Sequence, residues 1–121
     1  MARRREFAHL TTTGRRTGRE HTVELWFGVR GDTMYFLAGG GEHADWIRNA
    51  QFDPRVRVRL GRETLEGRAR LITDPDEELA ARRALAAKYE DWNAGRRLSS
   101  WARTALPLAV DVPAGSVAGE R

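Results

Sequence analysis

The stretch HLTTTGRRTGREHTVELWF, residues 9–27, joins a threonine-rich segment to an alternating apolar segment through a turn with two glycines and three arginines. Residues 7–13 are rich in β-branched and aromatic types and stop at Gly14, which is typical of a strand that enters a turn. Residues 21–29 alternate between apolar and polar side chains, as a half-buried strand does. The stretch therefore predicts the first hairpin of a sheet, with a basic turn at its tip.

The rest of the chain continues the same pattern. Six strands are expected, at residues 7–13, 21–29, 33–38, 55–60, 64–72 and 107–112. The first three are predicted to form a meander over residues 7–38. A short helix is expected to follow the glycine run and to end before Pro54, and a long helix to begin at the N-cap Asp74 and to end by Gly95. These elements predict an α+β protein, in which a six-stranded sheet curls into a small barrel beside one long and one short helix.

The composition predicts one cytoplasmic domain. A length of 121 residues suits a single domain, expected over residues 1–112, with residues 113–121 as a flexible C-terminal tail. No apolar run approaches the roughly 18 residues of a membrane-spanning helix, and the N-terminal residues 1–7 lack the apolar segment of a signal peptide. The chain has no cysteine, which excludes disulfides, thiolate metal ligands and cysteine nucleophiles.

The basic residues are nearly all arginine. The formal net charge is +4, and Lys88 is the one lysine among 21 basic residues. A GC-rich genome alone would favour arginine, but the guanidinium group is also well suited to phosphates and carboxylates. Because 17 acidic residues are interspersed with the basic ones, the charge gives only weak support for nucleic-acid binding, which usually shows a basic stripe, and no nucleic-acid partner is expected. A basic nucleic-acid-binding module stays as an alternative, and its affinity would fall steeply with salt.

The turn at residues 14–19 has two interpretations. A hairpin turn needs glycines and lies in water, so its composition requires no ligand, and short motifs of this kind are weak signals. Alternatively, backbone amides, the Thr17 hydroxyl and the guanidinium groups converge on a phosphate. The glycine run at residues 39–41, which precedes a predicted helix, is a second candidate contact for an anion or a ring edge. Two such loops at strand ends favour a phosphorylated ligand between them.

Other chemistry is less well supported. His9, His21 and His43 lie on separate predicted elements without the spacing of metal ligands, so no metal site is expected. The serines lack the sequence context of a nucleophile elbow, which disfavours hydrolysis. Most of the four tryptophans are expected in the core.

Three segments resemble a known family: LTTTGRRTGREHTVELWF, DWIRNAQFDPRVRVRLG and WARTALPLAV, with the glycine run between the first two. They resemble the nitroreductase-like deazaflavin-dependent oxidoreductases of the flavin/deazaflavin split β-barrel superfamily, and the resemblance extends over residues 7–112. It implies a six-stranded split barrel that binds coenzyme F420, whose phosphate and oligoglutamate tail carry several negative charges.

The resemblance also implies cofactor-binding positions. The family's basic turn, which holds the cofactor tail, falls on Arg15, Arg16, Thr17 and Gly18, with Arg19 or His21 as the later basic group. The loop that touches the deazaflavin ring falls on Ala38, Gly39, Gly40 and Gly41, and the tryptophan and asparagine of the next helix fall on Trp46 and Asn49.

This chain departs from the family pattern at several positions. Ala38 or Gly39 replaces a serine of the ring-contact loop, His21 replaces an arginine, and Glu24 stands where many relatives have proline. Relatives carry a tyrosine-rich C-terminal segment that lines the substrate pocket. The candidate acceptor-pocket residues of this chain are Tyr89, Trp92 and Trp101.

The resemblance predicts an oxidoreductase that transfers hydride from reduced F420 to an electron-poor acceptor such as a quinone, an enone or a nitroaromatic. The cofactor carries this chemistry, so no protein nucleophile is required. Two alternatives use the same barrel: an FMN-dependent oxidoreductase with its phosphate in the same turn, and a non-catalytic carrier of F420 or of a fatty-acid-like molecule. The expected partner is the small-molecule acceptor, and the expected assembly is a monomer or a homodimer.

Overall fold

The computed structural model describes residues 7–116, so that of the predicted tail at residues 113–121 only the first four lie within the described part. The strands are β1 (Ala8–Thr13), β2 (Glu20–Leu25), β3 (Gly28–Arg30), β4 (Thr33–Ala38), β5 (Arg55–Leu60), β6 (Glu63–Leu71) and β7 (Leu106–Asp111). The helices are α1 (Asp45–Phe52), α2 (Pro75–Tyr89) and α3 (Ser100–Thr104), and a 3₁₀ turn, η2 (Gly41–His43), precedes α1.

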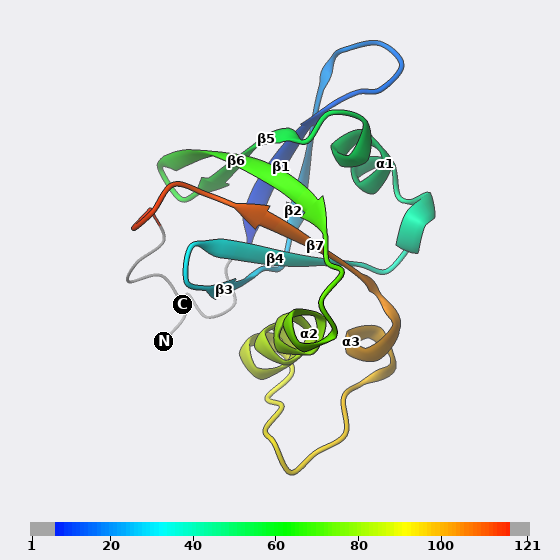
Figure 1. Ribbon diagram of the computed structural model, residues 1–121, viewed down its shortest axis with the longest axis vertical. Helices are drawn as coiled ribbons and strands as arrows, with labels where there is room; N and C mark the ends of the chain where they lie inside the picture. The colour runs from blue at the N-terminus through cyan, green and yellow to red at the C-terminus, as the bar shows by residue number, and fades with distance from the viewer. Residues whose placement is uncertain (1–6, 117–121) are drawn as a thin grey trace.

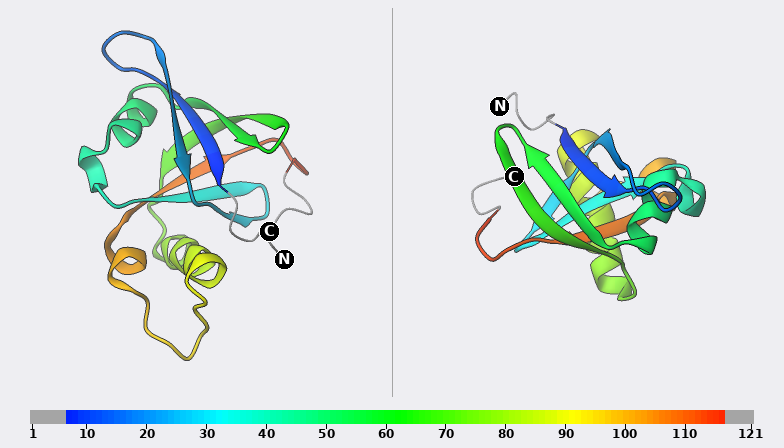
Figure 2. Two further views of the ribbon diagram at one scale, coloured as in Figure 1. Left: turned by 180° about the vertical axis from the view of Figure 1, so that it is seen from behind. Right: turned by 90° about the horizontal axis from the view of Figure 1, so that it is seen from above.

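The strands form one antiparallel sheet in the order β2-β1-β5-β6-β7-β4-β3. The sheet curls so that β2 and β3 are its two edges, and α2 packs on its outer face against β3, β4 and β7 (Figure 1). Helix α1 contacts β1 and β6 and lies at the other end of the molecule from α2 and α3 (Figure 2). The chain is therefore an α+β protein with a half-barrel sheet.

The expectation of six strands is wrong, because the strand predicted over residues 21–29 is two strands on opposite edges of the sheet. The break falls at Trp26 and Phe27. The Trp26 ring stacks on Tyr89 at 4.4 Å with an interplanar angle of 5°, and the Phe27 amide donates to the Tyr89 hydroxyl at 3.2 Å. These contacts with α2 replace the strand ladder. The predicted meander over residues 7–38 is consequently wrong too, since β4 pairs with β7 and β3 rather than continuing from β2.

The expectation of two helices is also wrong, because α3 is a third. Its N-cap is Ser99, whose hydroxyl accepts the Ala102 amide at 3.1 Å, a local signal that the sequence contained. The long helix begins with the predicted Asp74 cap and Pro75 and ends at Tyr89, in agreement with the expectation that it end by Gly95. Asp91 follows with a φ of 56°, a left-handed residue that turns the chain away from the helix axis.

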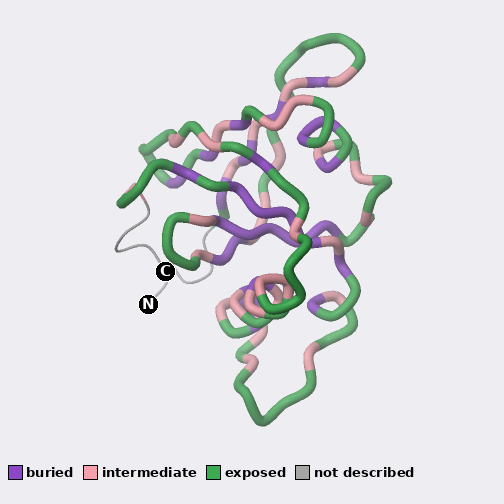
Figure 3. Tube along the Cα trace, viewed as in Figure 1, coloured by how far each residue is buried: buried purple, intermediate pink, exposed green. Residues whose placement is uncertain are grey.

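The core has two layers. One fills the inside of the half-barrel and includes Leu10, Phe36, Val58 and Ile47 of α1. The other lies between the outer face of the sheet and α2. The buried residues follow the central strands, whereas the tip of the β1–β2 loop is exposed (Figure 3).

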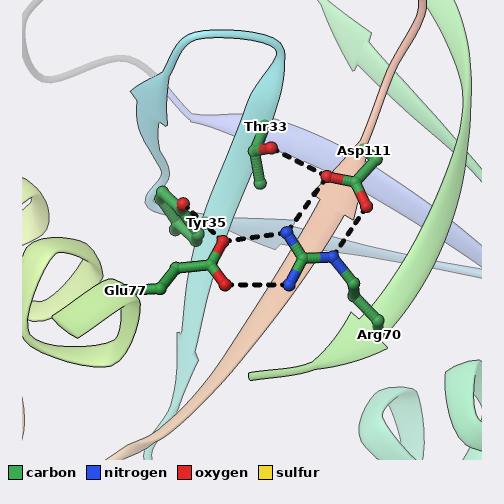
Figure 4. A network of polar contacts seen from close by, with 5 residues as sticks. All are labelled: Thr33, Tyr35, Arg70, Glu77 and Asp111. Atoms are coloured by element: carbon green, nitrogen blue, oxygen red, sulfur yellow. Dashed lines mark hydrogen bonds and ion pairs between the residues drawn. The ribbon is translucent and has the colours of Figure 1, made fainter. Parts of the chain in front are cut away.

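A polar network fastens the first turn of α2 to the sheet (Figure 4). The Arg70 guanidinium donates to both carboxylate oxygens of Glu77, at 2.9 and 2.8 Å, and to Asp111 at 2.7 Å. The Tyr35 hydroxyl donates to Glu77 at 2.8 Å, and the Thr33 hydroxyl donates to Asp111 at 2.7 Å. Hydrogen bonds from Arg70 lower the pKa of both carboxyl groups, and burial, together with the bond to Glu77, raises the pKa of Tyr35.

Candidate cofactor site

A pocket of about 590 Å³ lies between the β1–β2 loop and the N-terminus of α1. The loop and the helix lie beside one another at one end of the molecule in both face-on views (Figures 1 and 2). The pocket is lined by Gly14, Arg15, Arg16, Thr17, His21, Thr22, Val23, Asp45, Trp46 and Asn49. Six of the residues expected to bind cofactor are thus brought together here: Arg15, Arg16, Thr17, His21, Trp46 and Asn49.

The loop is a compact turn that needs both of its glycines. The Gly14 amide donates to the Arg19 carbonyl at 2.7 Å, the Gly18 amide donates to the Gly14 carbonyl at 2.9 Å, and Gly18 has a φ of 78°. The Thr17 hydroxyl accepts the Arg19 amide at 3.2 Å. Arg16 is exposed at the tip, where its guanidinium is accessible to a ligand from solvent.

Arg15 is held by α1. Its Nη1 atom donates to Asn49 Oδ1 at 2.8 Å, its backbone amide donates to the same oxygen at 3.2 Å, and its Nη2 atom lies 3.1 Å from Asp45 Oδ1. Asn49 is 3% exposed, and its amide nitrogen donates to the Thr12 hydroxyl at 3.3 Å. Asn49 therefore joins β1, the loop and α1, and it fixes the direction of the Arg15 side chain.

His21 lies against the loop because Gly14 has no side chain. A Cβ atom at Gly14 would lie 2.7 Å from His21 Nε2 and 3.0 Å from the Arg19 carbonyl. This close approach brings the imidazole to the wall of the pocket. The neutral or protonated ring can donate a hydrogen bond to an anion.

The charge of the pocket favours an anion. Arg15, Arg16 and His21 supply the basic groups, and Asp45 is the one carboxylate that the described residues contribute to the lining. Glu20, which follows the loop, is bound by Arg57 through two contacts of 2.6 and 2.7 Å, and these hydrogen bonds lower its pKa. Because Arg57 compensates Glu20, that carboxylate does not oppose an anion at the loop.

The N-terminus of α1 adds to this preference. Its N-cap, Ala44, makes no side-chain hydrogen bond to the first turn, so backbone amides face the pocket end of the helix without a side-chain acceptor. Trp46 is half-buried and packs its edge on Phe36, with ring centroids 6.5 Å apart. The loop at residues 14–19, which we call the basic loop, and the N-terminus of α1 therefore present hydrogen-bond donors to the pocket from two directions.

The remaining expected cofactor residues lie beside this pocket rather than in its lining. Gly18 and Arg19 complete the loop, and Ala38, 2% exposed, belongs to the core at the end of β4. Gly39 and Gly40 are exposed, and Gly41 begins η2 with a φ of 63°. This glycine loop directly precedes α1, so it connects the pocket to the end of β4.

The three expected acceptor-pocket residues do not converge. Tyr89 is 2% exposed and is packed against Trp26. The Trp92 indole nitrogen donates to the Arg96 carbonyl at 2.7 Å, beyond the end of α2. Trp101 lines a second pocket, of about 330 Å³, with Phe7, Glu24, Leu25, Trp26 and Leu37. Phe7 and Trp26 were not singled out from the sequence for an acceptor site, although the position of Trp26 on the polar side of the alternating segment was a signal.

Residues 7–116 contain neither of two further features, a metal-binding cluster and a membrane-spanning helix. No group of three or more His, Asp or Glu side chains in this range is arranged to hold a metal ion. Within the same range, no helix is both long enough and apolar enough to cross a membrane.

Solved structures share this fold at low sequence identity. An F420-H2 dependent reductase, FDR-A, aligns with a TM-score of 0.67 and 21% identity over 90% of this chain and 95% of its own. A domain-swapped dimer aligns with a TM-score of 0.68 and 22% identity over 88% and 81%, respectively. A FAD-binding protein from Mesorhizobium loti aligns with a TM-score of 0.60 and 17% identity over 89% and 81%. These likenesses establish the split-barrel fold.

The sequence itself identifies the family. The profile of the F420H2-dependent quinone reductases matches residues 3–113, which include the basic loop, the glycine loop and every described strand and helix. The chain belongs to the F420H2-dependent quinone reductase family.

Proposed function

We propose that this protein transfers hydride from reduced F420 to an electron-poor small molecule such as a quinone, an enone or a nitroaromatic. One observation supports the proposal: the basic loop and α1 line a single pocket with residues far apart in the sequence, Arg15, Arg16, His21 and Asn49. Membership of the F420H2-dependent quinone reductase family supports the choice of cofactor.

The residues present suit the polyanionic tail of F420. A planar guanidinium matches phosphate and carboxylate oxygens with paired donors, and Asn49 holds that of Arg15 in place before a ligand arrives. Arg16 is exposed at the tip of the loop, where its guanidinium can contact a tail that extends out of the pocket. The volume of about 590 Å³ is within the range of small-molecule sites.

The glycine loop suits a flat ring. Gly39 and Gly40 carry no side chain and are exposed, so a ring can approach their backbone closely. When bound, the deazaflavin ring supplies the hydride, and the protein holds the ring and leaves one face open to the acceptor. The Tyr89 hydroxyl is buried and accepts the Phe27 amide, so we assign the accompanying proton to solvent rather than to Tyr89.

Two observations favour specific variants of this proposal. The FAD-binding relative favours a flavin such as FMN in the same pocket, with its single phosphate at the basic loop. The domain-swapped dimer favours a homodimer, which the mass in solution tests directly. A carrier without catalysis requires that bound F420H2 survive a panel of quinones, enones and nitroaromatics without being oxidised.

Titration with F420 and with FMN, side by side in one buffer, tests the proposal. We expect tighter binding of F420, and at least about tenfold weaker F420 binding by Arg16→Glu, because a charge-assisted hydrogen bond is replaced by repulsion. The melting temperature should be unchanged, since Arg16 is exposed. Arg62→Glu, in the turn between β5 and β6, changes the net charge equally and should bind F420 normally. Equal affinity of the two variants for F420 would show that the loop does not bind the tail.

A further inference from the structure

The second pocket has aromatic walls that meet at a corner; we call it the aromatic pocket and define it by Phe7, Glu24, Leu25, Trp26, Leu37 and Trp101. The rings of Trp26 and Trp101 are in edge-to-face contact, 5.5 Å apart at 85°, and Tyr89 stacks on one face of Trp26, so the pocket is bounded by two perpendicular rings. The Phe7 ring lies 6.4 Å from Trp26 at 27° and is 43% exposed.

Among the described residues, one charged side chain lines this pocket. It belongs to Glu24, whose carboxylate remains 57% exposed although His9 Nε2 lies 3.4 Å away. Glu24 is the register partner of His9 across β1 and β2, so the two side chains project from the same face of the sheet. Phe7 precedes His9 by two residues, which places it on that face as well. The pairing of β1 with β2 therefore places the Glu24 carboxylate beside the aromatic side chains of the pocket.

We propose that the aromatic pocket binds small organic cations, with an aromatic ring or an N-alkyl group against the tryptophans and the positive charge near Glu24. The faces of aromatic rings attract cations, and two perpendicular rings contact an N-alkylated cation on two sides. The carboxylate adds an attraction that a neutral molecule of the same shape does not feel. A volume of about 330 Å³ accommodates a molecule of one or two rings.

The place of this pocket in the molecule makes it a candidate acceptor site, a role that rests on the proposed function. Trp101 is also the nearest side chain to Gly39, with a Cβ built there 3.8 Å from the Trp101 ring. A cation held against Trp101 therefore lies next to the glycine loop expected to contact the deazaflavin ring. A planar cation that accepts hydride forms one new C–H bond and becomes neutral, while reduced F420 is oxidised and releases one proton to solvent. The neutral product loses its attraction to Glu24, which favours its release.

Binding can be measured without F420, by titrating the full chain with phenyltrimethylammonium and with its neutral near-isostere 2-phenylpropan-2-ol while following tryptophan fluorescence. We expect the cation to bind at least about threefold more tightly, in line with exposed cation–π and ion-pair energies. Glu24→Gln should remove most of this difference. Phe7→Leu, which keeps an exposed apolar side chain but removes the ring, should weaken binding of both probes.

Glu63→Gln is the matched control, because Glu63 is an exposed carboxylate at the start of β6, outside the aromatic pocket. Equal affinity for the two probes, or equal affinity of Glu24→Gln and Glu63→Gln for the cation, overturns the proposal. The outcome is independent of cofactor binding. If F420 binds and the cation does not, the aromatic pocket is wrongly assigned; if the cation binds and F420 does not, the proposed reductase function fails instead.

Discussion

At the scale of single residues, the contacts that hold the proposed anion-binding loop in place include one that competes with a ligand. Arg15 is turned toward the pocket by buried Asn49, but its Nη2 atom is engaged by Asp45, whose side chain is 84% exposed. The Asp45 carboxylate occupies the place that a carboxylate or phosphate of the cofactor would take on Arg15. Asn49 and Asp45 contact the same guanidinium and should therefore have opposite effects on cofactor affinity.

Asp45→Asn is predicted to tighten F420 binding by up to about fivefold, because it removes an exposed charge that competes with the ligand for Arg15. Asn49→Ala is predicted to weaken binding and to destabilise the fold by about 1 to 3 kcal/mol, since the Thr12 hydroxyl and the Arg15 amide lose a buried partner. Fluorescence titration and urea unfolding measure the two effects. Weaker binding by Asp45→Asn would mean that Asp45 orients Arg15 instead of competing for it.

At the scale of elements, the sequence predicted what local signals determine. The start of α2 was predictable because the Asp74 side chain caps the helix two residues away, and β5 because its alternation reflects one buried face. The break between β2 and β3 was not predictable from local signals. It depends on the packing of Trp26 and Phe27 against Tyr89, which lies 62 residues from Phe27 along the chain. The aromatic pocket was missed for the same reason.

For the candidate cofactor site too, the sequence indicated some residues and gave no sign of the contacts between them. A short motif was enough to single out the loop at residues 14–19, and the resemblance supplied Trp46 and Asn49 from the helix. The bracing of Arg15 by Asn49 joins positions 34 residues apart, and no spacing rule in the sequence points to it. The dispersal of Tyr89, Trp92 and Trp101 was equally inaccessible, because it follows from where α2 ends and where α3 packs.

The network around Arg70 gives α2 a pH-dependent attachment to the sheet. Arg70 lowers the pKa of Glu77 and of Asp111 in the folded state. Groups with lowered pKa values stabilise the fold above their unfolded-state pKa values, near 4, and this stabilisation is lost as the pH falls through their folded-state values. The free energy of unfolding should therefore decrease as the pH falls below about 4.

Arg70→Met is predicted to cost about 1 to 2 kcal/mol at pH 7, a range limited by the partial exposure of Arg70 and Asp111. The difference from the parent chain should shrink at pH 3, because the stabilisation from carboxyl groups with lowered pKa values is lost as the pH falls below their unfolded-state pKa values. Urea unfolding at the two pH values measures this. Arg59→Met is the control, because exposed Arg59 donates to the Gly61 carbonyl and, within residues 7–116, to no carboxylate. A deficit of Arg70→Met that is the same at both pH values would contradict the electrostatic origin of the attachment.

At the scale of the whole molecule, a chain of net charge +4 with three arginines in the loop at residues 14–19 should be stabilised by a polyanion in a salt-dependent way. A ligand at a hundred times its Kd stabilises the folded state by about 2.7 kcal/mol, which for a domain of this size raises the melting temperature by roughly 10 °C. We expect F420 to produce such a shift at low salt.

Half-molar salt should reduce the F420 shift more than the FMN shift measured alongside it, because F420 has several tail charges to screen and FMN has one phosphate. Differential scanning fluorimetry with both ligands, at two salt concentrations, gives the four values needed. Arg16→Glu should reduce the melting-temperature shift that F420 produces at low salt. The further decrease of this shift in half-molar salt should then be smaller than for the parent chain. An F420 shift that salt does not alter would place the binding energy in the ring contacts at Gly39 and Gly40 rather than in the basic loop, and would move the site of recognition from the tail of the cofactor to its ring.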